Sequence, residues 1–301
     1  MRSILNDDRT ALKLGSFCFG IPVTLHYTFF LLLLIELLAS IRYMYPAFTL
    51  YIFLLYGPVL LVTILIHELG HALSTRKLGG EVGEIILWPL GGFALCGPTD
   101  SGAKGDLVVA VSGPLTHLLQ MAIWIAFYAV FNGGYFSTFS MSYFLTDLSR
   151  SCSSFMAVLS QQSFWTNLFI MAFNLFIPAY PLDGGRCLAS TLILCGVNVN
   201  RAALITSVTA IVLATSLFLW GVVSFIWLHS PNGLFTALIA IFVFTSSWQL
   251  WDLYKAGRVK DHPLFGRACY NEREVQPSIQ SEGAHSQSTD ETPAVESGTM
   301  A

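Results

Sequence analysis

The chain has 301 residues, of which 54% are hydrophobic and only 11% are charged, and its mean hydropathy is +0.63. This balance excludes an ordinary soluble domain and is typical of a protein that crosses a lipid bilayer several times. The formal net charge of -3 leaves no basic excess, so we expect no nucleic-acid partner. The composition therefore predicts an all-α polytopic membrane protein in contact with the lipid bilayer.

Residues 1–20 are polar and mixed in charge, and we expect them to form a cytoplasmic N-terminal segment. The apolar run over residues 21–41 is about as long as one membrane span, and Pro22 is tolerated at the start of a helix. His26 would lie about one turn inside this helix. Its ring could contact a bound substrate or only make a hydrogen bond near the membrane interface.

The second predicted span, residues 50–78, carries the sequence His67-Glu68-Leu69-Gly70-His71. Side chains at positions i and i+4 project from the same face of a helix, so both histidines can bind one zinc ion. Glu68 would then lie beside any water that the metal holds. Such groups are costly in lipid unless they face a polar interior or bind something. The alternative is a hydrogen-bonded polar cluster that holds helices together.

Residues 81–98 are too rich in glycine and proline for a helix and too apolar for an ordinary loop. They predict a short re-entrant segment resembling a β-hairpin, which dips in beside the site on the second span. A strand edge there could pair with an extended substrate segment. An interfacial loop with no substrate role is the alternative.

The third and fourth spans are predicted over residues 107–131 and 164–180. Gly113-Pro114 permits close packing of the third span, on which His117 could reach the site or only join two helices. Between them, residues 132–162 read as an extramembrane loop with an interfacial aromatic segment.

The fourth span leads into Pro178 and Pro181, which prevent a regular helix and turn Asp183 inward on a turn completed by Gly184-Gly185. Catalytic zinc usually has three protein ligands, and the histidine pair supplies two. Asp183 is therefore the candidate third ligand. Its alternative role is to cap the helix that follows.

Two further spans are predicted over residues 202–228 and 234–251, as bundle packing or a lateral gate. Residues 252–301 begin with a basic juxtamembrane run and end in a polar cytoplasmic tail that should be disordered. With six spans, both termini share the side that carries most of the lysines and arginines. Both termini and the opening of the zinc site are therefore expected to be cytoplasmic.

Together these motifs resemble the site-2 protease family of intramembrane zinc metalloproteases. The resemblance is to its compact branch without PDZ or CBS domains, which includes the bacterial sporulation-factor processing protease. The residues that carry it are His67-Glu68-Leu69-Gly70-His71, Gly91-Gly92, Ser112-Gly113-Pro114, Asn174, Pro178, Pro181 and Leu182-Asp183-Gly184-Gly185.

The resemblance implies that residues 21–251 form a transmembrane metalloprotease domain in a bacterial cell membrane. It implies one zinc ion on His67, His71 and Asp183, with Glu68 as the general base and a zinc-bound water as the nucleophile. The expected reaction is hydrolysis of peptide bonds within or near the transmembrane helices of membrane-protein substrates, in regulated intramembrane proteolysis.

Asn174 is implied to hold the substrate or stabilise the oxyanion, and the remaining candidates for such a role are Gly91, Gly92 and His26. One departure concerns His117, where the family often has asparagine. This departure leaves open which contacts the third predicted span makes with the site.

Two other functions fit the same residues. A metal or proton transporter would use intramembrane histidines and carboxylates as a relay, but it predicts polar residues along several helices from one membrane face to the other. Here those residues cluster toward the expected cytoplasmic half. A non-catalytic homologue that only binds membrane partners would be free to lose Glu68, which is present.

Overall fold

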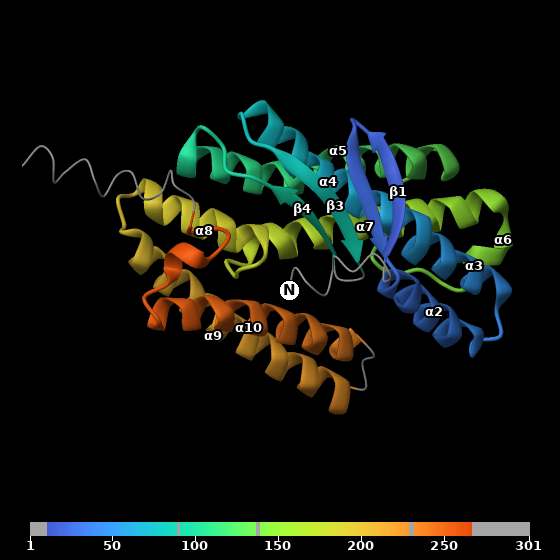
Figure 1. The fold of residues 1–301 in the computed structure, drawn as a ribbon. Coiled ribbons are helices and arrows are strands. Elements are labelled where there is room, and N and C mark those ends of the chain that lie inside the picture. The colour runs from blue at the N-terminus through green and yellow to red at the C-terminus, as the bar shows by residue number, and fades with distance from the viewer. Residues whose placement is uncertain (1–10, 89–90, 137–138, 229–231, 267–301) are drawn as a thin grey trace, which may run out of the picture.

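The structure, a computed structural model, describes residues 11–88, 91–136, 139–228 and 232–266. Most of these residues are helical, and the N-terminal third contributes one small sheet (Figure 1). The all-α prediction is therefore correct for the helices and incomplete for the sheet, of which it anticipated only a hairpin.

The sheet has four strands, β1 (Ala11–Cys18), β2 (Ile21–His26), β3 (Val82–Trp88) and β4 (Gly91–Cys96), in that spatial order. Strands β1 and β2 are antiparallel, β2 and β3 are parallel, and β3 and β4 are antiparallel. The hairpin predicted over residues 81–98 is thus present as β3 and β4, joined to a larger sheet. Its depth in the membrane stays a prediction.

The first predicted span, residues 21–41, is wrong at its beginning. Ile21, Val23 and Leu25 alternate along β2 and are buried with Ile85 and Leu87 of β3. This alternation, combined with pairing on both edges of β2, favours a strand over the helix that the apolar run alone predicted. The helix that follows, α2 (Thr28–Ile41), has 14 residues, fewer than the roughly 20 needed to cross a bilayer.

The second predicted span falls on a helical run that is long enough to cross a membrane and that begins earlier than residue 50. It consists of α3 (Pro46–Leu54), a π-helical turn η1 (Leu55–Val59) and α4 (Leu60–Lys77), and together they make a helical run of 32 residues. Pro58 lies inside the wide turn and removes one backbone donor, which accounts for the local change of helix type.

The remaining helices are α5 (Gly102–Phe131), α6 (Asp147–Arg150), α7 (Cys152–Phe176), α8 (Asp183–Leu194), α9 (Val199–Ile226), α10 (Asn232–Lys255) and the short η2 (Val259–Asp261). The loop predicted over residues 132–162 is wrong from residue 152, because the Ser151 hydroxyl caps α7 by accepting from the Ser154 amide. The fourth span predicted over residues 164–180 is therefore the second half of a longer helix. Gly184 and Gly185, expected in a turn, lie in the first turn of α8.

Among the described residues, four helices are long and apolar enough to cross a membrane: Pro46–Lys77, Gly102–Phe131, Val199–Ile226 and Gly233–Lys255. The expected number was six. The first helix is too short, and α7 carries Gln161, Gln162 and Asn167 and is not among the four. These four helices identify an integral membrane protein, while the six-span topology stays a prediction.

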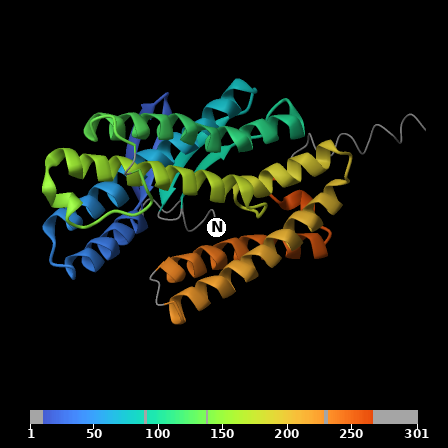
Figure 2. The same cartoon turned by 180° about the vertical axis from the view of Figure 1, so that it is seen from behind.

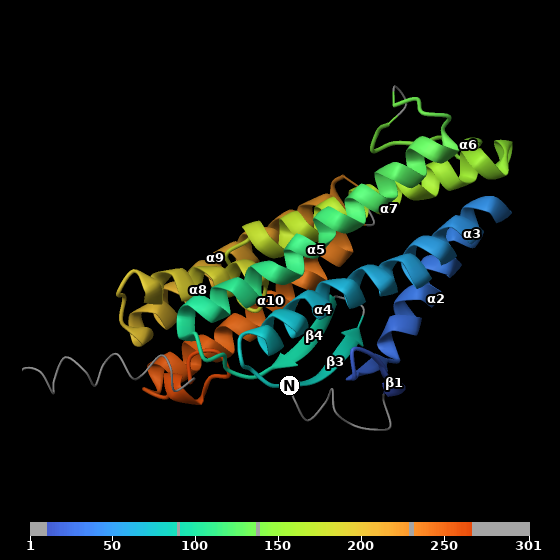
Figure 3. The same ribbon diagram turned by 90° about the horizontal axis from the view of Figure 1, so that it is seen from above.

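The N-terminal part of the fold is layered, with the sheet, helix α4 and helix α5 stacked in that order (Figure 3). Helix α4 lies between α5 and the strands β3 and β4 (Figure 3). Helices α5 and α7 run side by side on the side of α4 away from the sheet, and they lie in front of α4 in Figure 2. Helices α9 and α10 form a pair of their own (Figure 1). Helix α4 is therefore covered on both of its buried sides.

The chain after α10 was expected to be a basic and then a disordered segment from residue 252. Within the basic segment, Val259, Leu264 and Phe265 are buried against α8, α9 and α10 in one apolar cluster. The disordered tail that was predicted from residue 275, and residues 1–10 of the predicted N-terminal segment, lie outside the described residues.

Candidate metal centre

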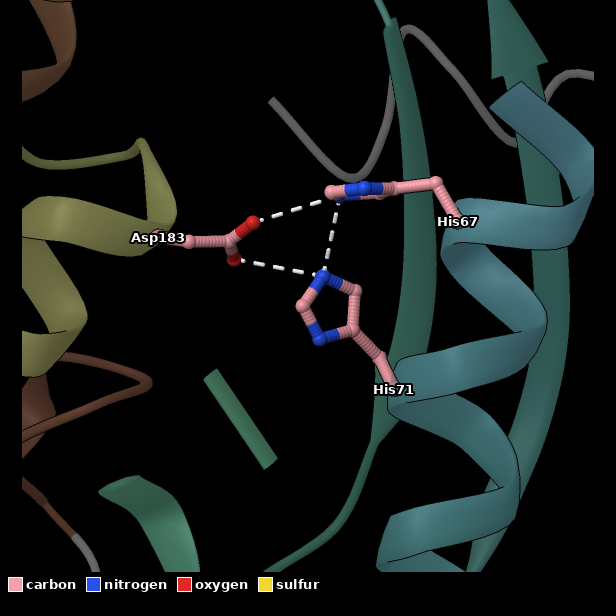
Figure 4. A group of neighbouring side chains, drawn as sticks. All are labelled: His67, His71 and Asp183. Carbon is pink, nitrogen blue, oxygen red and sulfur yellow. Dashed lines mark hydrogen bonds and ion pairs between the residues drawn. The ribbon is translucent and has the colours of Figure 1, made fainter. Parts of the chain in front are cut away.

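Helix α4 and the first residue of α8 bring three side chains together. His67 Nε2 lies 3.2 Å from Asp183 Oδ2, and His71 Nε2 lies 3.2 Å from Asp183 Oδ1. The two Nε2 atoms are 3.1 Å apart. All three residues are at most 5% exposed. Figure 4 shows the two rings of α4 facing the carboxylate of α8.

The spacing of these atoms fits a tetrahedral metal ion. Ligand atoms that a zinc ion holds at about 2.0–2.1 Å lie roughly 3.3 Å from one another. The two Nε2 atoms are 3.1 Å apart, and each lies 3.2 Å from a different oxygen of the Asp183 carboxylate, so these separations are close to that value. Two imidazole nitrogens and one carboxylate are also a usual protein donor set for catalytic zinc.

The hydrogen bonding of His71 gives a second reason to place a cation here. His71 Nδ1 lies 2.7 Å from the carbonyl oxygen of Val109, which can only accept, so Nδ1 carries the ring hydrogen. Nε2 of the neutral ring then presents a lone pair to a carboxylate oxygen 3.2 Å away. Two electron-rich atoms at this distance repel unless a cation, either a proton or a metal ion, lies between them.

Asp183 is held in place by neighbours on both sides. The Asn174 amide nitrogen donates to Asp183 Oδ2 at 2.8 Å and lies 3.1 Å from His67 Nε2. Arg186, one turn further along α8, places a guanidinium nitrogen 3.7 Å from Asp183 Oδ1. The irregular segment between α7 and α8 lets Asn174 and Asp183 approach the same point, as the two prolines suggested.

Glu68 is 5% exposed and faces the sheet from α4. Its Oε2 atom accepts a hydrogen bond from the backbone amide of Ala94 in β4, at 2.9 Å. Since this amide is used by Glu68, it points away from β3, and the outer edge of β4 therefore faces the site. The second oxygen, Oε1, stays available for a proton.

Gly113 explains why α5 can approach the site so closely. A Cβ atom at this position would lie 2.3 Å from His71 Nε2, which no real side chain tolerates. The close packing predicted from Gly113-Pro114 is thus confirmed, and it falls on a candidate ligand.

The other candidates fall at different places. Gly91 and Gly92 lie on β4, where Gly92 adjoins Glu68. The ring of His26 makes its hydrogen bond with Thr28 at the start of α2, and His26 is not in the group of three. One residue was missed. Asn167 of α7 bonds the ring of His117, which in turn contacts His67.

The only sequence signal for Asn167 is its place as a polar residue within a mostly apolar helix. An asparagine there can bond a backbone carbonyl of the preceding turn and keep its side chain inside the protein.

The family of the chain follows from a match over its central part. Residues 56–222, more than half of the chain, match Peptidase family M50. The chain belongs to this family. The resemblance to site-2 proteases is thereby confirmed, and the matched stretch contains all three residues of the metal centre.

Two curated proteins are similar to this chain. The chain is 31% identical over 176 residues to zinc metalloprotease MJ0392 of Methanocaldococcus jannaschii, covering 58% of this chain and 43% of that protein. It is 30% identical over 135 residues to stage IV sporulation protein FB of Bacillus subtilis, covering 43% and 37%. The chain thus spans less than half the length of either relative.

Among solved structures, the site-2 protease from Methanocaldococcus jannaschii is similar in fold, with a TM-score of 0.51 and 28% identity. The match covers 79% of this chain and 94% of that one. The described residues therefore have the site-2 protease fold.

Proposed function

We propose that the protein is a zinc-dependent intramembrane endopeptidase that hydrolyses peptide bonds within or near the transmembrane helices of membrane-protein substrates. The observation that carries this proposal is the convergence of His67, His71 and Asp183 beside a buried Glu68, on a helix long enough to cross a membrane. The M50 family and the names of the similar proteins support the same reaction class.

His67 Nε2, His71 Nε2 and one Asp183 oxygen would hold a single zinc ion. Bound zinc supplies Lewis acidity, which makes water acidic near neutral pH and polarises a peptide carbonyl. The lipid and the covering helices exclude bulk water from these buried groups, which strengthens every charge interaction among them.

Glu68 would move the proton. Its Oε2 stays bonded to the Ala94 amide, so Oε1 takes a proton from the attacking water while the water oxygen bonds to the substrate carbonyl carbon. Oε1 then returns the proton to the amide nitrogen as the carbon–nitrogen bond breaks. The products are a carboxylic acid and an amine, and Glu68 is regenerated.

The substrate would bind in an extended form. A helical peptide bond is shielded because its carbonyl is hydrogen-bonded, so the substrate helix must unwind before attack. The outer edge of β4, over residues 91–95, faces away from β3 and offers backbone groups to an extended segment beside Glu68. Asn174, whose amide already donates into the site, would hold the substrate or stabilise the oxyanion.

The basic residues support a cytoplasmic opening of this site, and the similarity to stage IV sporulation protein FB of Bacillus subtilis supports a bacterial cell membrane. Arg76 and Lys77 end α4, and Lys255 ends α10. By the positive-inside rule these ends lie in the cytoplasm. This orientation is part of the proposal.

The deciding experiment replaces Glu68 with glutamine in the full chain, reconstituted in liposomes with a transmembrane substrate. We expect E68Q to keep its zinc and to lose at least about a hundredfold in cleavage rate, because the amide cannot accept the proton. Glu81 is exposed and lies just before the start of β3, so E81Q is the matched control and should cleave normally.

Two results would contradict the proposal. One is wild-type cleavage by E68Q with zinc bound, which would remove the role of the base. The other is zinc-dependent flux across the liposome membrane with no proteolysis by the wild-type chain, which would favour a transporter.

A further inference from the structure

His117 is a completely buried histidine that the proposed reaction does not use. It lies on α5 with 0% exposure. Its Nε2 is 3.1 Å from His67 Nδ1, and its Nδ1 is 2.8 Å from Asn167 Oδ1. His117 therefore contacts Nδ1 of His67, whereas Nε2 of His67 faces Asp183. His117 is consequently not a candidate metal ligand.

The backbone carbonyl of Ser163 fixes the donor and acceptor roles in the hydrogen bonds that link Asn167, His117 and His67. The Asn167 amide lies 2.9 Å from the backbone carbonyl of Ser163, one turn earlier on α7. A carbonyl can only accept, so the atom facing it is the NH2 group. The other amide atom, Oδ1, faces His117 and can only accept.

This order determines the hydrogen on each imidazole. His117 must donate from Nδ1 to Asn167 Oδ1, and a neutral ring then has a lone pair on Nε2. That lone pair accepts from His67, so His67 carries its hydrogen on Nδ1. The lone pair of His67 is consequently on Nε2, the atom that lies 3.2 Å from Asp183.

We infer that Asn167 and His117 are positioning residues that hold His67 in its metal-binding tautomer and ring orientation. They do for His67 what the Val109 carbonyl does for His71. Residues that hydrogen-bond the second ring nitrogen of a metal-ligating histidine generally fix its tautomer and increase its metal affinity. The inference rests on the metal centre of the proposed function, but it concerns metal binding and needs no proteolysis.

The test measures the zinc affinity of the full purified chain by competition with a chelator. H117L and N167L should each weaken zinc binding, by about tenfold to a hundredfold. Gln120 lies on the same helix, is buried, and has no hydrogen-bond partner for its amide nitrogen among the described residues. Q120L is therefore the matched control, and its zinc affinity should be that of the wild type.

A double variant separates a positioning role from general loss of packing. If Asn167 acts only through His117, then N167L has no further effect on zinc affinity once His117 is leucine. Additive losses in the H117L/N167L variant would overturn the inference, because they would mean two independent effects.

A conservative variant provides the rescue. The side-chain oxygen of glutamine reaches about as far as histidine Nε2 and can accept from His67, so H117Q should recover most of the affinity that H117L loses. Failure of H117Q to bind zinc better than H117L would contradict the inference, as would wild-type affinity in H117L. The proposed peptidase activity is tested separately by E68Q, which is expected to keep its zinc and lose cleavage.

Discussion

Gly92 gives the Glu68 side chain its space. A Cβ atom on Gly92 would lie 2.5 Å from Glu68 Cγ and 2.7 Å from Oε1, the oxygen assigned to proton transfer. Gly83, on the neighbouring strand β3, would place its Cβ at an ordinary 3.6 Å from Leu95. The two glycines thus differ in what a methyl group meets, which makes them a matched pair.

We predict that G92A lowers the cleavage rate by about a hundredfold, since displacing a catalytic group by about 1 Å can cost that much. Zinc content should stay at one ion per chain, because Gly92 adjoins the base and not the ligands. G83A is expected to cleave at the wild-type rate. The measurement is kcat on a reconstituted transmembrane substrate, and a G92A enzyme with normal kcat would refute this placement of Glu68.

At the scale of elements, the β3–β4 hairpin meets α10 through aromatic rings. The ring centroid of Trp88 in β3 lies 4.9 Å from that of Phe242 in α10, in an edge-to-face arrangement. The Trp88 ring also stacks on Phe93 of β4, with 5.6 Å between the ring centroids. Phe93 in turn lies 6.4 Å from Phe242. Since α9 and α10 otherwise pack mainly on each other, this cluster directly connects α10 to the strands beside the candidate metal centre.

We expect F242A to loosen the hairpin. Aromatic pairs contribute about 0.5–1.5 kcal/mol beyond simple burial, so amide hydrogen exchange over residues 91–96 should accelerate about two- to tenfold. The control is F244A, since the ring of Phe244 stacks on Trp248 of its own helix. Equal amide hydrogen-exchange rates over residues 91–96 in F242A and wild type would mean that the aromatic contacts do not stabilise the hairpin.

At the scale of the whole molecule, the chain after α10 folds back and closes the end where α8, α9 and α10 meet. Its buried residues include His262, whose ring lies 4.9 Å from Tyr180 and 5.6 Å from Phe265. His262 Nδ1 accepts from the Leu264 amide at 3.2 Å. Burial lowers the pKa of His262 from 6.5 to about 4.

This pKa sets the sign of a pH effect. The unfolded segment binds a proton near pH 6.5 and the folded one only near pH 4, so stability is complete above pH 6.5 and falls between these values. The full loss is roughly 3 kcal/mol. We predict that hydrogen exchange over residues 259–266 accelerates as pH falls from 7 to 5, after correction for intrinsic rates.

H262N is the control for this effect, because asparagine can accept from the Leu264 amide and does not titrate. Its exchange over the same residues should not depend on pH in this range beyond the intrinsic rates. A wild-type protein with the same flat profile would contradict the buried neutral histidine.

Parts of the fold were predictable because they depend on local pattern. The apolar lengths of α5, α9 and α10 and the Gly/Pro-rich stretch around β3 and β4 indicated their structures directly. Residues 21–26 did not, since a short apolar run fits a helix or a strand equally well. Their conformation depends on pairing with β3, about 60 residues later in the chain.

The amino-acid sequence by itself determined which side chains can bind a metal. His67 and His71 share a helix face by their spacing, and the need for a third ligand pointed to Asp183. Only the tertiary structure decided what surrounds them, including the Val109 carbonyl, the Ala94 amide and the chain of contacts through His117 and Asn167. The physical reason is that hydrogen bonds between distant segments depend on how helices and strands pack, which no local spacing encodes.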